Sequence, residues 1–218
     1  MKVETYLRMT DQKYETVLAD VRKAPRQQLP VLDIDGTLVP DSTAIIELLE
    51  GKRDPKLDAH LATTDHAIGQ AFKSMLEEHL YFAILFMRWS VDDGFTVWDP
   101  EIRKMLAKGG VPSFLRGVVT GRIRKGVMDR SARQGIGRMP RTEVVGAAKK
   151  LIDAFSVYLA ERTFFMGDKP TTFDATAYAF AAALLCPAWD NELTKHSTAK
   201  KNLVDYEKRL RDAYWTDS

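Results

Sequence analysis

The sequence has one cysteine and no apolar run that approaches the roughly 20 residues of a membrane-spanning helix. A lone Cys186 cannot form an internal disulfide or a CxxC redox pair, which favours a reducing, cytoplasmic compartment. The first residues, MKVETYLRMTDQ, contain no apolar stretch followed by a small-residue cleavage site. We therefore expect neither a secretory signal nor insertion into a membrane.

A strong net charge is also lacking. The 32 Lys and Arg residues nearly balance the 30 Asp and Glu residues, so the chain as a whole is not expected to bind nucleic acid. The histidines do not have the spacing of a metal site, and we expect no metal. They are His60, His66, His79 and His196.

One segment departs from this balance. Between residues 116 and 141 only Asp129 opposes eight basic residues, which are Arg116, Arg122, Arg124, Lys125, Arg130, Arg133, Arg138 and Arg141. The segment lacks the interleaved aromatic residues of a nucleic-acid stacking surface. We favour a solvated helix face with intramolecular ion pairs, and the alternative is a site for an acidic partner or nucleic acid.

The N-terminal quarter of the sequence mixes helix and strand patterns. Residues 1–10 have the apolar spacing of an amphipathic helix, and residues 14–19 form a short strand candidate. Two β-rich pieces meet at Asp35-Gly36, and Asp41 and Ser42 precede a helix pattern that ends at Gly51. These patterns predict a small α/β domain over residues 1–52.

The rest of the sequence contains only helix patterns. We predict helices over residues 59–91, 101–132, 142–162, 172–186 and 198–213. The strand–helix alternation of a large doubly wound sheet is missing. The sequence therefore predicts an all-helical C-terminal domain over residues 57–218.

The stretch VLDIDGTL, residues 31–38, has two interpretations. Its Asp-x-Asp-Gly-Thr-Leu pattern resembles the first motif of haloacid-dehalogenase-type phosphatases, in which Asp33 would attack phosphorus and Asp35 would act as general acid and base beside Mg²⁺. That motif requires a buried parallel strand, whereas Pro30 and a short apolar run indicate an edge strand. We favour a hairpin that turns tightly at Asp35-Gly36.

Six blocks carry a resemblance that extends along the whole chain. They are KVETYLRMTDQKYE (2–15), Gln28-Leu29-Pro30, Asp41-Ser42-x-x-Ile45, YFAILFMRWSVDD (81–93), QGIGR (134–138) and FMGDKPTTFDAT (165–176). In this order they are similar to blocks of the glutathione transferase superfamily, and most closely to its branch related to failed-axon-connections and metaxin-like proteins. The resemblance implies a thioredoxin-like N-terminal domain followed by a helical domain.

The resemblance also implies a glutathione site in the N-terminal domain. Gln28, Leu29 and Pro30 correspond to the loop that carries the family's cis-proline, where the main chain of Leu29 pairs with the cysteinyl unit of glutathione. Ser42, at a helix start, corresponds to the site of the γ-glutamyl carboxylate, and Asp41 to a partner for the ammonium group. Lys23 and Arg26 are candidates for the glycyl carboxylate.

Two further sets of residues belong to the helical domain. The resemblance implies that Tyr81, Leu85 and Trp89 line an apolar cleft for a small hydrophobic electrophile, near the interface of a homodimer. Thr171 and Asp174 match an S/T-x-x-D capping box, a structural motif in which each side chain accepts from the other residue's backbone N–H.

No catalytic residue is assigned within the numbered chain. In this superfamily a Tyr, Ser or Cys near the first strand activates the thiol, and we expect that residue, together with the first strand, upstream of Met1. The sequence is therefore interpreted as a glutathione transferase shortened at its N-terminus. The alternatives are a non-catalytic binding protein on the same scaffold and, with less support, the phosphatase.

Overall fold

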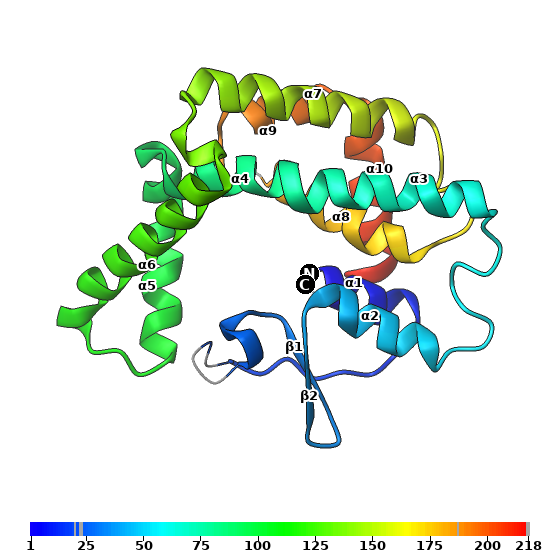
Figure 1. Ribbon diagram of the computed structural model, residues 1–218, viewed down its shortest axis with the longest axis horizontal. Helices are drawn as coiled ribbons and strands as arrows, with labels where there is room; N and C mark the ends of the chain where they lie inside the picture. The colour runs from blue at the N-terminus through cyan, green and yellow to red at the C-terminus, as the bar shows by residue number, and fades with distance from the viewer. Residues whose placement is uncertain (20, 22–23, 187, 217–218) are drawn as a thin grey trace. The chain divides into compact units, whose positions relative to one another are not determined.

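The computed structural model describes residues 1–19, 21, 24–186 and 188–216 (Figure 1). The first part contains α1 (Lys2–Met9), the 3₁₀ turn η1 (Pro25–Gln27), β1 (Val31–Ile34), β2 (Thr37–Pro40) and α2 (Ser42–Gly51). The remainder contains α3 (Thr63–Ser74), η2 (Met75–Leu80), α4 (Tyr81–Trp89), α5 (Asp92–Lys108), α6 (Ser113–Gln134), η3 (Ile136–Arg138), α7 (Arg141–Leu159), α8 (Thr172–Leu184), α9 (Glu192–Thr198) and α10 (Lys201–Tyr214). Among the described residues, no helix combines the length and apolar character needed to cross a bilayer.

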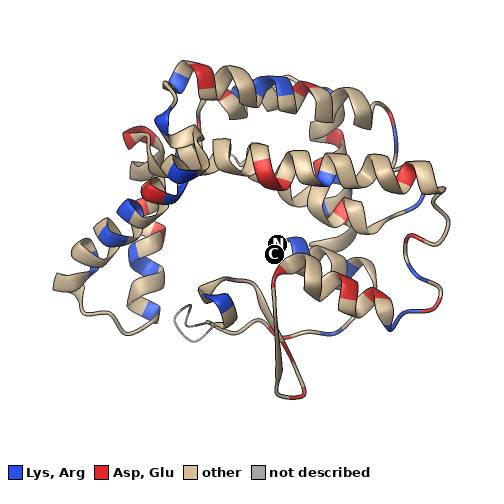
Figure 2. Ribbon diagram, in the orientation of Figure 1, with Lys and Arg blue, Asp and Glu red and all other residues tan. Residues whose placement is uncertain are grey.

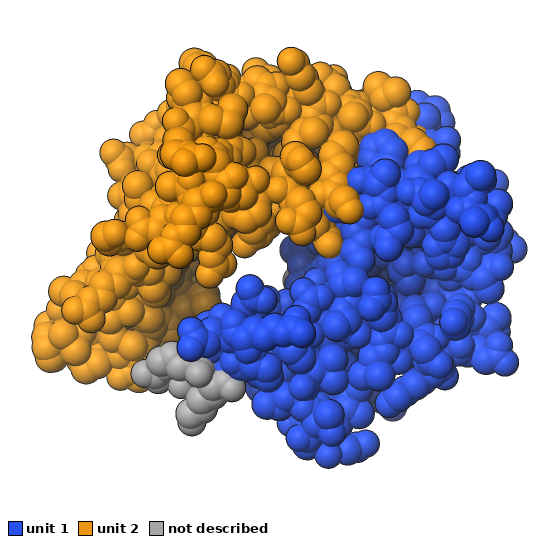
Figure 3. Space-filling view, viewed as in Figure 1, with its two compact units in different colours: residues 1–73, 159–182, 205–218 blue, residues 74–158, 183–204 orange. Residues whose placement is uncertain are grey.

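The chain packs as two compact units, coloured separately in Figure 3. Unit 1 comprises residues 1–73, 159–182 and 205–218, and unit 2 comprises residues 74–158 and 183–204. Each unit is therefore assembled from segments that are distant in the sequence.

Unit 1 contains the predicted hairpin. β1 and β2 pair antiparallel in a two-stranded sheet, and the last pair, Ile34 with Thr37, leaves Asp35 and Gly36 as the turn. Both turn residues have positive φ angles, 52° and 82°, as a two-residue hairpin of this kind requires. The predicted turn at Asp35-Gly36 is confirmed.

The predicted strand over residues 14–19 is wrong, because these residues have no regular secondary structure. A strand is stable only when its N–H and C=O groups find a neighbouring strand. The Tyr14 side chain lies beside α1 instead, where its hydroxyl accepts a 2.8 Å hydrogen bond from Nε of Arg8.

The core of the N-terminal part of unit 1 joins α1 to α2. Val3, Tyr6 and Leu7 are the buried residues of α1 that pack here. They meet Ile45 and Ile46 of α2, and Tyr14, Leu32, Val39, Leu49 and Leu57 pack around them. The amphipathic helix predicted at the start of the chain is thus confirmed, and it positions α2 from one side.

Asp174, near the start of α8, is fully buried in unit 1. Its Oδ2 accepts from the N–H and the hydroxyl of Thr171 at 2.9 and 2.8 Å. The bond from the Thr171 N–H is one half of the predicted capping box. In the other half the Asp174 N–H donates to the Thr171 carbonyl at 3.1 Å, instead of to the hydroxyl that the box predicts. Oδ1 accepts from the N–H of Phe165 at 2.6 Å and from the hydroxyl of Tyr206 at 2.8 Å. One carboxylate therefore holds together α8, α10 and the segment before α8.

Unit 2 contains a break that the sequence analysis missed. The single helix predicted over residues 101–132 is two helices, α5 and α6, separated at Gly109-Gly110, where Gly110 has a φ of 81°. α5 also begins at Asp92, earlier than the predicted residue 101. In its first half, Trp98 packs over the guanidinium of Arg88, whose carbon lies 4.5 Å from the ring centroid.

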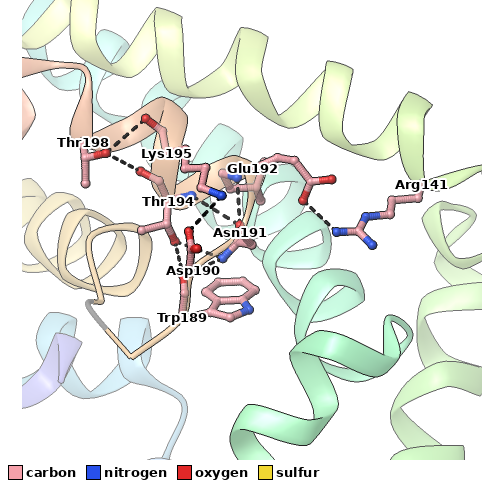
Figure 4. Close-up of polar contacts among 9 residues, drawn as sticks. Arg141, Trp189, Asp190, Asn191, Glu192, Thr194, Lys195 and Thr198 are labelled. Atoms are coloured by element: carbon pink, nitrogen blue, oxygen red, sulfur yellow. Dashed lines mark hydrogen bonds and ion pairs between the residues drawn. The ribbon is translucent and has the colours of Figure 1, made fainter.

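α9 was not predicted at all. Figure 4 shows the contacts that start it: Oδ1 of Asn191 accepts from the N–H groups of Leu193 and Thr194 at 2.8 and 3.3 Å. The same amide donates to the Trp189 carbonyl at 2.9 Å. An ion pair of 2.8 Å between Glu192 and Arg141 then connects α9 to α7.

Candidate functional site

The start of α2 is held by Asp41. Its carboxylate oxygen Oδ1 accepts from the N–H groups of Thr43 and Ala44 at 2.8 and 3.1 Å, a helix cap that stabilises the first turn. Asp41 itself has φ 75° and ψ 129°, outside the allowed regions for an L-residue with a side chain. Such a backbone conformation costs roughly 1–3 kcal/mol and is concentrated at ligand sites.

The loop that precedes β1 lies next to this cap. Gln28, Leu29 and Pro30 are all exposed, and the Leu29–Pro30 peptide bond is cis. The main-chain N–H of Asp41 donates to the Pro30 carbonyl at 3.2 Å. The structure therefore brings the two predicted parts of the site together within unit 1.

Unused hydrogen-bonding groups remain on both sides of this contact. Within the described part of the chain, neither the N–H nor the carbonyl of Leu29 has a hydrogen-bond partner. Ser42 is the first residue of α2. Because the N–H groups of Thr43 and Ala44 already donate to Asp41, the N–H and hydroxyl of Ser42 are the donors that remain at this helix start among the described residues. Such a helix start favours an anion, since the positive end of the helix dipole adds to these remaining donors.

Lys2 is a residue that the sequence analysis missed. Its Nζ donates to Oγ1 of Thr43 at 3.1 Å, which places an ammonium group at the first turn of α2. Lys2 and Thr43 are 41 residues apart, and no local pattern connects them. Of the two cations proposed for the glycyl carboxylate, Arg26 is exposed in η1 with a φ of 59°, and Lys23 lies outside the described residues.

A cavity of about 350 Å³ in unit 1 does not include the predicted residues. It is lined from α2, α3 and α8, and by Lys2, Lys56 and Asp58. Its buried acids already have protein partners: Glu50 accepts from the Tyr6 hydroxyl at 2.7 Å and the Leu57 N–H at 2.9 Å. Burial and the neighbouring Glu50 raise the pKa of Tyr6, which keeps this hydroxyl protonated. The buried carboxylate of this cavity is therefore occupied by protein donors, and its contacts connect α1, α2 and the segment after α2.

The residues proposed for the second substrate lie along α4 of unit 2. Tyr81 is exposed, and its ring meets Phe82 edge to face with centroids 5.3 Å apart. The Trp89 carbonyl accepts from Nε of Arg124 at 2.8 Å. Leu85 is half-buried. A cavity of about 820 Å³ in this unit is lined by His79 and Ala83, among others, and by none of the three residues proposed for the second substrate.

The phosphatase interpretation finds no support in the geometry. Asp33 lies on an antiparallel hairpin with its carboxylate directed at the turn, where Oδ1 accepts from the Gly36 N–H at 2.8 Å. Asp35 is exposed in the turn itself. A central, buried parallel strand that would end in these residues is missing from the part of the chain that the structure describes.

Comparison with known proteins finds family matches to both the N-terminal and the C-terminal part of the chain. A family model described as the glutathione S-transferase N-terminal domain matches residues 1–95, and one described as the C-terminal domain matches residues 148–210. The isoprene-epoxide–glutathione S-transferase of Rhodococcus sp. (strain AD45) is 33% identical, over 98% of this chain and 90% of its own length.

More distant relatives extend the comparison. Failed axon connections of Drosophila melanogaster is 29% identical over the whole of this chain and 54% of its own length, and metaxins are also similar. The crystal structure of the beta-etherase LigF from Sphingobium sp. strain SYK-6 superposes with a TM-score of 0.64, covering 96% of this chain and 89% of that chain at 16% identity. It shows the same fold, a small α/β part followed by helices. The chain belongs to the glutathione S-transferase family, in the branch that includes failed axon connections and the metaxins.

Proposed function

We propose that this protein binds glutathione at the loop–helix site formed by Gln28, Leu29, Pro30, Asp41 and Ser42. The observation that carries the proposal is the hydrogen bond from the Asp41 N–H to the Pro30 carbonyl, because it holds the exposed Leu29 main chain beside the start of α2. The strained backbone of Asp41 supports it, since such strain persists where a ligand site benefits from it.

Each part of the tripeptide has a partner of suitable chemistry. The cysteinyl unit pairs with the N–H and carbonyl of Leu29, as an added strand pairs with an exposed main chain. The γ-glutamyl carboxylate binds at the hydroxyl and N–H of Ser42, with the Lys2 ammonium nearby. Oδ2 of Asp41 is the acceptor for the ligand's ammonium, because Oδ1 is used by the helix cap. Arg26 is the candidate for the glycyl carboxylate.

The reaction we propose is attack of the glutathione thiolate on an electrophilic second substrate. The named activity of the 33% identical relative makes an epoxide the first electrophile to test. The thiol must lose its proton to become the nucleophile, and the positive end of a helix favours the thiolate. None of the residues assigned to the site is a base for this proton. Catalysis therefore needs a further group that accepts or polarises this proton.

The alternative is a binding protein without catalysis on the same scaffold. The failed axon connections and metaxin relatives share the family of this chain, and the alternative applies to the whole branch. Turnover of an epoxide or an aromatic chloride with glutathione separates the two proposals. Product formed faster with the protein than in buffer supports the enzyme, and glutathione binding without turnover supports the binding protein.

Calorimetry with glutathione tests the binding site. Leu29→Pro removes the N–H that the cysteinyl unit needs, whereas Leu29→Ala keeps it, so only the proline variant is expected to lose binding. Ser42→Ala should weaken binding about tenfold, because it removes one hydrogen bond to a charged group. Ser113→Ala, at the exposed start of α6, is the matched control and should bind like the parent chain. Equal affinity of all four variants would refute the site.

Two further properties complete the proposal. We expect a homodimer in the cytoplasm, as the family resemblance and the single cysteine indicate. Light scattering over a range of protein concentrations measures the mass in solution. A mass of one 24.7 kDa chain at all concentrations would contradict the dimer.

A further inference from the structure

The tip of the α5–α6 hairpin exposes a cluster of apolar side chains. Figure 1 shows α5 and α6 side by side, joined by a short turn at one end. Around this turn the fractional exposure is 79% for Phe114, 61% for Met105, 56% for Val118 and 40% for Leu115. Phe114 and Val118 are one helical turn apart and therefore lie on the same face of α6.

The buried side of α6 is polar where a helix normally buries apolar residues. Thr120 and Ser131 are 1% and 0% exposed, and Arg124 is partly buried with its Nε bonded to the Trp89 carbonyl. α6 thus packs in unit 2 through polar side chains and leaves its larger apolar ones outside. An exposed apolar patch on a folded protein indicates a binding surface.

The same hairpin is strongly basic. Residues 92–134 contain nine Lys and Arg residues and five acids, a net charge of +4, whereas the whole chain carries only +2. Four of the acids lie in the part of α5 away from the turn, so residues 103–133 have only Asp129 against the nine cations. Figure 2 shows these cations along α5 and α6. Several already form ion pairs within the hairpin, such as Arg103 with Asp99 and Lys125 with Asp129. Within the described hairpin, four exposed cations form no ion pair: Lys108, Arg122, Arg130 and Arg133.

The apolar and basic residues occupy successive levels of the hairpin. Phe114, Val118 and Arg122 follow at intervals of four residues on one face of α6. At 1.5 Å per residue, Arg122 is about 12 Å behind Phe114 along the helix. Apolar side chains at the tip and cations behind them match the order of acyl chains and phosphates in a lipid bilayer.

We propose that the α5–α6 tip docks on the surface of an anionic lipid bilayer. Phe114, Leu115 and Val118 of α6 enter the interface, and Arg122 behind them, together with Lys108 at the turn, contacts the negatively charged headgroups. Shallow insertion of an apolar face together with attraction between Lys or Arg and anionic lipids is sufficient for reversible membrane binding.

Other occupants fit the surface less well. A second copy of the chain would bring two hairpins of high positive charge together, which is unfavourable. Nucleic acid would satisfy the cations but leave four apolar side chains against phosphates, without the stacking aromatics that single strands need. An acidic protein is disfavoured because the apolar residues form a projecting tip, whereas helical peptides bind in grooves.

Flotation of the full chain with lipid vesicles tests the proposal. One set of vesicles is phosphatidylcholine, and the other has about a fifth of its lipid replaced by phosphatidylserine. We expect binding to the phosphatidylserine vesicles at low salt, weaker binding at high salt because salt screens the cations, and little binding to phosphatidylcholine alone.

Two double variants separate the apolar and electrostatic contributions. Phe114→Ser with Val118→Ser should lower vesicle binding about tenfold, because two side chains no longer enter the interface. Lys108→Gln with Arg122→Gln should lower binding and reduce its dependence on salt. Val157→Ser is the matched control, since Val157 is 78% exposed in the same unit but far from the hairpin in sequence. Circular dichroism shows that each variant is folded.

The possible results decide the question. Binding to anionic vesicles that the Phe114/Val118 variant loses, while the Val157 variant keeps it, supports the proposal. Failure of the folded parent chain to bind anionic vesicles at low salt overturns it, and so does binding that the Phe114/Val118 substitutions leave unchanged. Self-association or binding of RNA that depends on the same residues, without vesicle binding, assigns the tip to those partners instead.

Discussion

The main-chain N–H of Asp41 and the carbonyl oxygen of Pro30 form a 3.2 Å hydrogen bond that links the loop before β1 to the start of α2. Asp41 has a positive φ of 75° at this bond, and the same residue caps the helix through its carboxylate. A substitution of Asp41 therefore removes the side-chain cap but keeps the main-chain N–H that bonds to Pro30.

Replacement of Asp41 should reveal the strain. Asp41→Ala removes the cap and keeps a Cβ in the strained conformation, so we expect the free energy of unfolding to fall by about 2 kcal/mol. Asp41→Gly also removes the cap but relieves the strain, and its loss should be clearly smaller. Urea denaturation measures the free energy of unfolding of both variants. A glycine variant less stable than the alanine variant would contradict the claim that the Asp41 backbone is strained.

Asp174 and Tyr206 connect α8 and α10 in the interior of unit 1. Tyr206→Phe leaves Oδ1 of Asp174 with only the Phe165 N–H, and we expect a loss of about 1–2 kcal/mol. Asp174→Ala leaves all four donors without their acceptor and should cost about 3 kcal/mol or more. Tyr178→Phe is the control, because Tyr178 is equally buried and its ring stacks on Trp215. Thermal unfolding that is alike for both tyrosine variants would contradict the assigned role.

The stability of unit 2 should depend on pH through Asp153. Lys200, 2.6 Å away, and His196, 2.8 Å away, hold the pKa of Asp153 below its ordinary value. A carboxylate with a lowered folded-state pKa contributes stability above its unfolded-state pKa, and this contribution is lost as the pH falls through the folded-state pKa. Because the groups are partly exposed, solvent limits the effect to roughly 0.5 kcal/mol.

Two variants measure that contribution by urea denaturation across the acidic range. Asp153→Asn should be less stable than the parent near neutral pH and equally stable in strong acid. Asp168→Asn, at an exposed carboxylate of unit 1, is the control and should differ little from the parent at either pH. A difference for Asp153→Asn that grows as the pH falls would have the wrong sign.

Arg88 is a half-buried cation whose guanidinium lies over two indole rings that meet edge to face. Its guanidinium carbon lies 4.5 Å from the Trp98 ring centroid and 5.1 Å from that of Trp189, and burial lowers its pKa. Within the described residues its Nε has no hydrogen-bond partner. Arg88→Lys loses the planar stack but keeps the charge, and should cost about 1–2 kcal/mol. Arg88→Met fills the same space without a charge and should be neutral or stabilising. A methionine variant less stable than the lysine variant would contradict this balance.

The sequence predicted features that depend on local chemistry. Asp35-Gly36 specified its turn because both residues tolerate a positive φ, and Asp41 indicated a helix start because its short acidic side chain reaches the first free N–H groups. The helical C-terminal part followed from apolar periodicity over long segments. These features depend on residues within a few positions of one another.

Features that depend on distant residues were missed. The strand expected at residues 14–19 lacks a neighbouring strand, and the donors to Asp174 include Tyr206, which is 32 residues away. Lys2 reaches the start of α2 only because α1 packs against that helix. α9 is seven residues long, too short for a periodic pattern to distinguish it from a loop.

The measurement that tests the central claim most directly is a nuclear magnetic resonance titration of the ¹⁵N-labelled chain with glutathione. If the loop–helix site binds the tripeptide, the backbone amide signals of Leu29, Asp41, Ser42 and Thr43 shift together and saturate, with a smaller change at Lys2. Signals that stay in place at saturating glutathione, or shifts confined to the cavity residues Lys56, His66 and Lys73, would contradict the proposed site.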